Sequence, residues 1–204
     1  MKTVFLHGLG QTADDWKDIG SKIASDKVEC PALFSMAQND LCYAQILTAL
    51  ERRYAAAEEP LCLCGLSLGG MLALDYTLRH PEKVGALVLI GVQYRVPGWL
   101  VDVQNLVFHC MPDRMFKSMG VPKGDVIKLA HSMRELDFTA KLKSVRCSVT
   151  ILCGEKDHAN KKAAKRVKSL LPQAKLYMVP GAGHELNRDA PEVIVEVLQN
   201  IGQA

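Results

Sequence analysis

The chain has 204 residues, of which 49% are hydrophobic and 23% charged, and its formal net charge is +3. This composition is typical of an ordinary globular domain and argues against a disordered or fibrous protein. The small net charge argues against nucleic acid as a partner, because lysines and arginines are matched by a similar number of acids. The basic run at residues 161–168 is interpreted as a solvated helix face, with a nucleic-acid patch as the alternative.

The cysteines indicate a reducing compartment. There are seven, an odd number, and Cys62, Cys64 and Cys153 lie inside apolar runs where a thiol behaves as a small hydrophobic group. The Cys-x-Cys spacing differs from that of zinc sites and redox pairs. The chain enters a strand almost at once, which leaves no room for a signal peptide, and no apolar stretch has the length of a membrane helix. We therefore expect a cytoplasmic protein without a membrane partner.

The first quarter of the chain alternates strand and helix patterns. Residues 4–6 predict a buried strand that enters a glycine loop. A helix is expected at residues 14–24, where an aspartate can cap the first turn. Residues 28–31 predict a weaker strand at the edge of the sheet, since a proline cannot donate a ladder hydrogen bond. Apolar residues at helical spacing then predict a helix at residues 40–57.

The same alternation continues to the end of the chain with one interruption. Further strands are expected at residues 61–64, 84–90, 148–153 and 175–179. Helices are expected between and after them, at residues 71–79, 160–171 and 191–199. Because strands alternate with helices, we predict an α/β fold whose mostly parallel sheet is covered on both faces.

The interruption lies at residues 92–142. Prolines at 97, 112 and 122 divide this stretch into short helical pieces. We interpret it as a cap inserted at the carboxyl edge of the sheet, which is where open parallel sheets bind ligands. The predicted organisation is a single domain over residues 1–204 with the cap insertion within it.

A motif that can carry chemistry follows the strand at residues 61–64. Gly65-Leu66-Ser67-Leu68-Gly69 is a G-x-S-x-G sequence between a predicted strand and a predicted helix. Such a turn projects the serine hydroxyl above the sheet, beside a helix N-terminus that favours negative charge. Ser67 is therefore a candidate nucleophile. The alternative is a glycine-rich turn with an incidental serine.

With these residues the chain resembles the α/β-hydrolase family, and the likeness extends over nearly its whole length. That family orders its nucleophile, acid and histidine on loops that follow strands. Here Ser67, Asp157 and His184 occur in that order and in that context. The resemblance implies the α/β-hydrolase fold, and because the chain lacks the family's initial hairpin, we expect about six strands flanked by helices. It also implies a catalytic triad, in which the family's Gly-x-x-Asp pattern favours Asp157 over Glu155 as the acid.

The resemblance assigns further groups by backbone position. The loop His7-Gly8-Leu9-Gly10 is similar to the family's oxyanion loop, so the backbone N–H groups of Leu9 and Leu68 are expected to form the oxyanion hole. The His7 ring is expected to be structural. No cluster has metal-site spacing and no nucleotide-binding glycine motif follows a strand, so neither a metal nor another cofactor is expected.

The substrate pocket is predicted more loosely. Gln11 could project a polar group into it, and four cap residues, Trp99, Phe108, Met111 and Met115, could form an adaptable apolar wall for an acyl chain. The alternative is that the cap residues simply pack the cap onto the core. The chain lacks the hairpin with which the family usually begins and its cap is short. This indicates an open site or one completed by a second subunit, so a homodimer is one expectation.

The sequence thus predicts a serine hydrolase that cleaves a carboxylic ester or thioester of a small or medium acyl substrate through an acyl-serine intermediate. Two alternatives stay open. One is perhydrolase, acyl-transfer or carbon–carbon bond chemistry on the same triad, because a fold does not choose the reaction. The other is a ligand-binding member of the fold without catalytic activity.

Overall fold

The computed structural model describes residues 1–23, 27–37, 41–117 and 121–202, without the side chains of Leu100, Met115 and Lys117. In this part of the chain six strands form one sheet in the order β2-β1-β3-β4-β5-β6, and every neighbouring pair is parallel. This confirms the predicted α/β fold. The strands are β1 (Lys2–Leu6), β2 (Val28–Glu29), β3 (Leu61–Leu66), β4 (Val84–Ile90), β5 (Ser148–Gly154) and β6 (Lys175–Val179).

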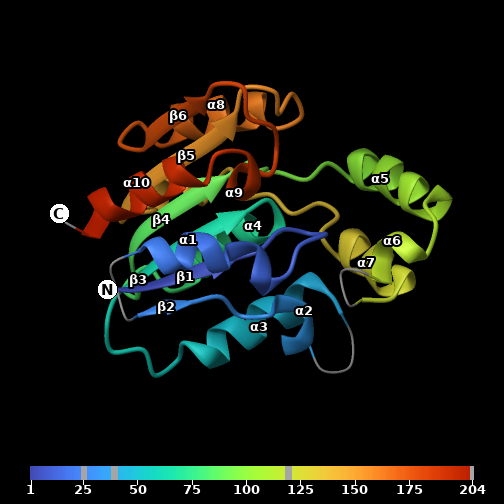
Figure 1. Ribbon diagram of the computed structural model, residues 1–204, viewed down its shortest axis with the longest axis horizontal. Coiled ribbons are helices and arrows are strands. Elements are labelled where there is room, and N and C mark those ends of the chain that lie inside the picture. The colour runs from blue at the N-terminus through green and yellow to red at the C-terminus, as the bar shows by residue number, and fades with distance from the viewer. Residues whose placement is uncertain (24–26, 38–40, 118–120, 203–204) are drawn as a thin grey trace.

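Helices cover both faces of the sheet (Figure 1). One face packs against α1 (Lys17–Lys22) and α10 (Pro191–Gly202), and the other against α3 (Tyr43–Arg53), α4 (Leu68–Arg79) and α8 (Lys161–Leu170). The remaining described elements are η1 (Ala13–Trp16), α2 (Leu33–Met36), α5 (Gly98–Cys110), α6 (Arg114–Lys117), α7 (Lys123–Ser132), η2 (Leu142–Ser144) and α9 (Leu186–Asp189).

The two cores are divided by the alternation of side chains along the central strands. On β3, Leu61 and Leu63 belong to the core under α3 and α4, whereas Cys62 and Cys64 belong to the core under α1 and α10. Each of these four side chains is at most 2% exposed, and full burial of a leucine contributes about 2 kcal/mol. Burial also raises the pKa of the Cys62 thiol to about 12, so it stays protonated and packs as a small apolar group.

The cap formed by α5, α6 and α7 lies beyond the edge at which the strand arrowheads end (Figure 1). Its two connections to the sheet run antiparallel and are joined by backbone hydrogen bonds, including Val96 N to Leu136 O at 2.8 Å and Phe138 N to Tyr94 O at 2.9 Å. Phe116 is 1% exposed and belongs to the same core cluster as α3 and α4. The cap is therefore anchored both at its base and through its apolar interior.

The structure agrees with most of the predicted elements and differs at their ends. The strands expected at residues 84–90 and 175–179 coincide with β4 and β6. The helix expected at residues 40–57 is shorter, since α3 spans Tyr43–Arg53. Its predicted first residue, Asp40, lies outside the described residues, as does Ala24 at the end of the helix expected at residues 14–24.

Two short helices were not predicted, and one cap helix is longer than predicted. The α2 and α9 helices have 4 residues each, too few to produce a visible apolar period. The cap was expected to contain only short helical pieces. The α5 helix nevertheless extends over 13 residues, because the prolines of the cap lie outside this helix. No described helix is long and apolar enough to cross a membrane.

The tight contact between α4 and β1 yields the first prediction. A Cβ added at Gly69 would lie 2.0 Å from the backbone oxygen of Leu6, which cannot move aside without disturbing the sheet. Gly69→Ala should therefore lower the free energy of unfolding by at least about 2 kcal/mol, as measured by urea denaturation.

Gly124 provides a matched control for that substitution. It lies in α7 with no atom within 4 Å of an added Cβ. Gly124→Ala should leave stability unchanged or raise it by up to about 1 kcal/mol, because alanine favours a helix. Equal stability of the two variants would show that the helix and strand do not touch as described.

Candidate active site

Ser67 stands at the turn between β3 and α4, with φ 52° and ψ −115°. Residues other than glycine rarely adopt positive φ, so the fold holds this serine in a strained conformation. Its backbone N–H donates to the carbonyl oxygen of Ile90 at 2.9 Å, which fixes the turn to the end of β4. The serine itself is only partly buried. The turn thus has the geometry that the G-x-S-x-G pattern predicts.

Asp157 and His184 lie in the loops that follow β5 and β6. The Nδ1 of His184 donates to Oδ2 of Asp157 at 2.8 Å. The Asp157 side chain is 4% exposed and that of His184 is 40% exposed, so the carboxylate is buried while the imidazole stays partly open. Glu155 instead accepts a hydrogen bond from the backbone N–H of Gly181 at 3.0 Å. The geometry therefore pairs His184 with Asp157 rather than with Glu155.

Gly91 brings this pair next to the serine turn. It directly follows Ile90, whose carbonyl holds Ser67, and it has a φ of 55°. A Cβ added at Gly91 would lie 2.9 Å from Nδ1 of His184 and 3.1 Å from Oδ2 of Asp157. The serine turn and the Asp157–His184 pair therefore meet at one short segment at the carboxyl end of β4.

Asn160 keeps the carboxylate of Asp157 charged. Its Nδ2 lies 2.8 Å from Oδ1 and 2.9 Å from Oδ2 of Asp157, and its own Oδ1 accepts from Gln93 at 2.8 Å. Burial pushes the pKa of Asp157 upward, but the hydrogen bonds from His184 and Asn160 outweigh it, so the pKa lies below the ordinary value of 3.8. Asp157 is thus ionised at neutral pH and can stabilise a protonated imidazole.

The two amides predicted for the oxyanion hole have no hydrogen-bond acceptor in the described part of the chain. Leu68 is the first residue of α4, and Leu9 lies in the loop after β1. Amides at a helix N-terminus favour negative charge, which suits a developing oxyanion near Ser67.

His7 has the structural role that the sequence predicts. Its Nδ1 donates to the carbonyl oxygen of Gly8 at 3.0 Å, and its Nε2 accepts from the backbone N–H of Leu33 at 3.1 Å. It is 1% exposed, and burial lowers the pKa of its ring. The neutral ring therefore connects the loop after β1 to α2.

Gln11, which was predicted to project into the substrate pocket, is buried among the loops. Both polar atoms of the Gln11 side chain are engaged inside the protein, by Gly8, Glu185 and Asn187. No polar group is therefore left to meet a substrate, and we assign Gln11 to the loops rather than to the pocket.

Three of the four cap residues predicted for the pocket have side chains that the structure describes. Trp99 is 66% exposed. Phe108 packs edge-on against Phe116 at 5.9 Å, and Met111 packs against the main core. These two contacts favour the cap-packing alternative. The side chain of Met115 lies outside the described residues.

Sequence reasoning missed Asn160 and Gly91. Asn160 precedes α8, where an asparagine predicts an ordinary helix cap, but its side chain makes no cap hydrogen bond and turns to Asp157. The signal that could have revealed it is its position three residues after the acid, within reach of its carboxylate. Gly91 could have been noticed as a glycine that directly follows a buried strand.

A separate cavity lies away from these residues. Its volume is about 440 Å³, and it is lined by Gly85, Ser148 and Lys175 near the amino ends of β4, β5 and β6. Open parallel sheets bind ligands at the opposite, carboxyl edge. We therefore place the candidate site at Ser67 and His184. Among the described residues, no group of three histidine, cysteine or acidic side chains could hold a metal ion.

Fold and site together define a parallel-sheet protein with a strained serine turn and a neighbouring aspartate–histidine pair. The model of the Alpha/beta hydrolase family matches residues 3–197. The chain belongs to this family, which confirms the resemblance inferred from its motifs.

Individual relatives are more distant. The chain is similar to pimeloyl-[acyl-carrier protein] methyl ester esterase of Aromatoleum aromaticum, with 34% identity over 43% of this chain and 36% of that protein. It is also similar to the putative 2-succinyl-6-hydroxy-2,4-cyclohexadiene-1-carboxylate synthase of Bacillus subtilis, with 22% identity over 67% of this chain and 63% of that protein. The chain thus spans less than two thirds of either relative.

A solved structure extends the likeness to the whole fold. MenH from S. aureus superposes with a TM-score of 0.79 and 17% identity, covering 100% of this chain and 93% of that one. At this identity the likeness concerns the fold alone.

The network around Asp157 yields a prediction on charge. Asn160→Ala removes the hydrogen bonds from the Asn160 side chain to the carboxylate, so the pKa of Asp157 should rise relative to the parent protein, as followed by carbon NMR of the carboxyl group. Asn200→Ala, on the exposed side of α10, is the control and should leave that pKa unchanged. An unaltered pKa in Asn160→Ala would exclude the proposed role of Asn160.

The lowered pKa also predicts how stability depends on pH. Because the folded pKa of Asp157 lies below its ordinary value, ionisation of this group stabilises the fold above about pH 4, and this contribution is lost as pH falls through the folded pKa. The difference in unfolding free energy between the parent and Asp157→Asn, measured by urea denaturation, should therefore shrink toward acid pH. Growth of that difference at acid pH would contradict the assignment.

Proposed function

We propose that this protein is a serine hydrolase that cleaves a carboxylic ester or thioester of a small or medium acyl substrate. The observation that carries the proposal is the junction at Ile90 and Gly91. Ser67 is tied to Ile90 through its backbone, and the hydrogen-bonded pair of His184 and Asp157 lies against Gly91. Three side chains from distant loops therefore share one edge of the sheet.

The chemistry follows from the state of each group. With Nδ1 of His184 donating to Asp157, the free Nε2 is the basic nitrogen that can accept the hydroxyl proton of Ser67. The oxygen of Ser67 then attacks the acyl carbon, and the amides of Leu9 and Leu68 hold the oxyanion. His184 returns the proton to the leaving alcohol or thiol. Water, activated by the same imidazole, hydrolyses the acyl-serine.

The relatives support this reaction class. One of them is named a methyl ester esterase, and the chain belongs to a hydrolase family. The same alignments leave room for a second candidate, carbon–carbon bond chemistry on the same triad, because another relative is named a putative carboxylate synthase. A small-molecule acyl substrate, the cytoplasmic location and a homodimer remain predictions of the sequence.

The proposal is tested with a fluorophosphonate probe, which reacts with an activated serine, and a panel of p-nitrophenyl esters and acyl-CoA thioesters of graded chain length. The protein should be labelled at Ser67 and hydrolyse short or medium members of the panel. Ser67→Ala should abolish labelling and lower kcat by at least about 10³-fold.

Each outcome separates the candidate functions. Labelling without hydrolysis of any ester or thioester would favour the carbon–carbon candidate. A folded protein, verified by circular dichroism, that is neither labelled nor active would favour a ligand-binding protein and overturn the proposal.

A further inference from the structure

The two halves of the proposed site follow strands that belong to the same sheet but are not neighbours in it. The loop that carries Leu9 follows β1, and the loop that carries His184 follows β6. In the sheet order these strands are separated by β3, β4 and β5. Ladder hydrogen bonds connect only neighbouring strands, so no ladder directly links the loop of the oxyanion amide to the loop of the imidazole.

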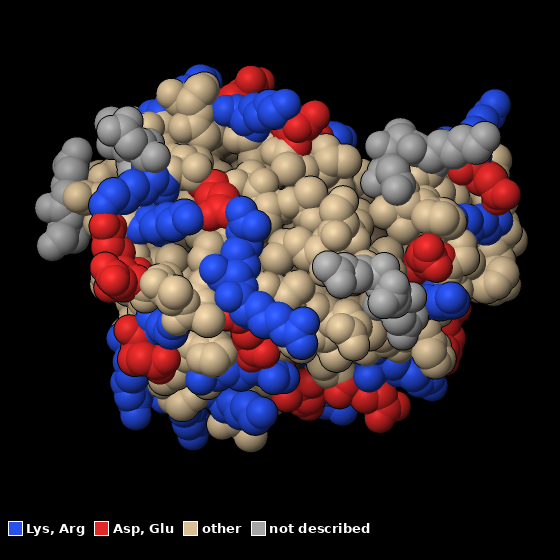
Figure 2. Space-filling model, turned by 90° about the horizontal axis from the view of Figure 1, so that it is seen from below, with Lys and Arg blue, Asp and Glu red and all other residues tan. Residues whose placement is uncertain are grey.

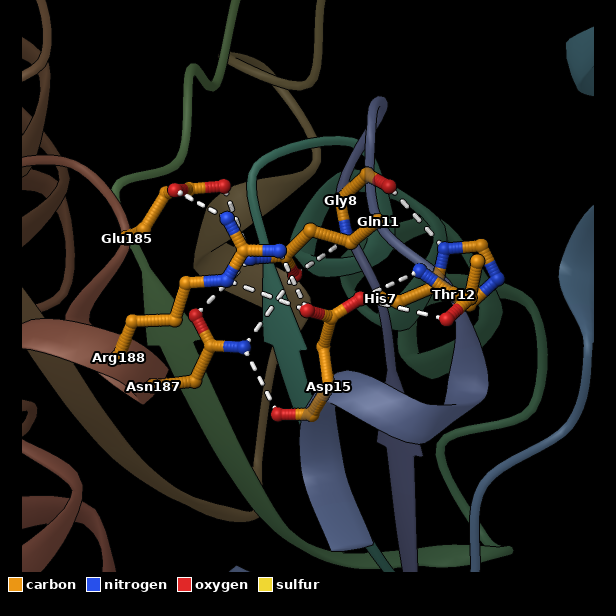
Figure 3. A network of polar contacts seen from close by, with 8 residues as sticks. All are labelled: His7, Gly8, Gln11, Thr12, Asp15, Glu185, Asn187 and Arg188. Carbon is orange, nitrogen blue, oxygen red and sulfur yellow. Dashed lines mark hydrogen bonds and ion pairs between the residues drawn. The ribbon is translucent and has the colours of Figure 1, made fainter. Parts of the chain in front are cut away.

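Gln11 supplies a direct link between these loops (Figure 3). Its Nε2 donates to Oε1 of Glu185 at 3.1 Å and to Oδ1 of Asn187 at 3.0 Å. Its Oε1 accepts from the backbone N–H of Gly8 at 3.4 Å and from Nδ2 of Asn187 at 3.4 Å. Gln11 is 1% exposed. Both donors and the acceptor of one buried amide are therefore used to join the loop after β1 to the residues that follow His184.

An outer ion pair reinforces the link. Arg188 donates through Nη2 and Nε to Oδ1 of Asp15, at 2.5 Å and 3.1 Å, and through Nη1 to Oε2 of Glu185 at 2.9 Å. The other carboxylate oxygen of Asp15 accepts from the backbone N–H of Thr12 at 2.8 Å. One carboxylate oxygen of Glu185 thus accepts from Gln11 and the other from Arg188. Glu185 directly follows His184 in the sequence.

The link acts on the peptide unit that contains the Leu9 amide. The carbonyl of Gly8 accepts from Nδ1 of His7 at 3.0 Å and from the backbone N–H of Gln11 at 3.2 Å. A trans peptide is planar, so the N–H of Leu9 points away from that carbonyl. The side chain of Gln11 holds the preceding peptide through the N–H of Gly8. The direction of the Leu9 amide is therefore determined by Gln11 and His7.

We propose that Gln11 is a positioning residue that sets the Leu9 amide relative to His184. The inference depends on the proposed function, because it assigns Gln11 a part in aligning the oxyanion hole. A misplacement on the order of 1 Å in an active site can lower a rate by about 10²-fold. Loss of the link should therefore lower kcat while KM stays nearly constant, since Gln11 has no atom left to bind substrate.

The sharpest test exchanges one donor for one acceptor. In Gln11→Glu the shape is kept, but a carboxylate oxygen replaces Nε2 and faces Oε1 of Glu185. We expect kcat to fall by about 10- to 100-fold on the p-nitrophenyl ester that the parent hydrolyses best. Adding Glu185→Gln restores a donor on the opposite side, while its amide oxygen still accepts from Arg188. The double variant should recover kcat to within about threefold of the parent.

Two further variants keep the test decisive. Arg188→Gln breaks the ion pair with Asp15 at a side chain that is 51% exposed, so it should fold and should lower kcat by about three- to tenfold. Gln199→Glu makes the same chemical change as Gln11→Glu on the exposed side of α10 and should leave kcat unchanged. Circular dichroism and thermal unfolding establish that each variant is folded before kcat is compared.

The outcomes separate this inference from the proposed function. A parent protein that hydrolyses no ester and is not labelled at Ser67 overturns both. An active parent with unchanged kcat in Gln11→Glu, or a double variant no faster than Gln11→Glu, overturns the positioning role alone. A lower melting temperature with kcat unchanged shows a merely structural link and equally overturns it.

Discussion

A buried carboxylate, Asp157, holds the imidazole of His184 at the carboxyl edge of the sheet through a hydrogen bond of 2.8 Å. Asn160 bonds both carboxylate oxygens and keeps the group charged despite its burial. A buried charge without such partners would take up a proton or destabilise the fold. The orientation of His184, and with it any chemistry at Ser67, depends on this pair. Gly91 gives it room, because any larger residue would collide with the ring.

The parallel sheet explains why distant loops meet here. In a parallel sheet all carboxyl ends lie at one edge, so the turns after β1, β3, β4, β5 and β6 form one surface. That these loops lie at the same edge does not by itself fix the relative positions of their side chains. Adjacent strands are aligned by their ladders, whereas β1 and β6 are connected at this edge through Gln11, Asn187 and the pair of Asp15 and Arg188 (Figure 3). The fold brings the groups together, and polar side chains set their relative positions.

Surface charge adds little to this picture. In the view of Figure 2, lysines and arginines are interspersed with aspartates and glutamates. This agrees with the net charge of +3 in a chain with 25 basic and 22 acidic residues.

The sequence alone determined the strand–turn–helix motif around Ser67, the parallel sheet and the order of Ser67, Asp157 and His184. The motif and the sheet follow from local patterns, namely apolar runs, glycines and their spacing, whereas the order of the three residues was assigned by the resemblance to the family. Some polar side chains have several suitable hydrogen-bond partners, and only the tertiary structure decided which partner each of them contacts. It directed Asn160 to Asp157 instead of a helix cap, and Gln11 to the loop after β6 instead of a pocket. The partners of Gln11 lie more than a hundred residues away in the sequence. No local sequence pattern can therefore predict such contacts.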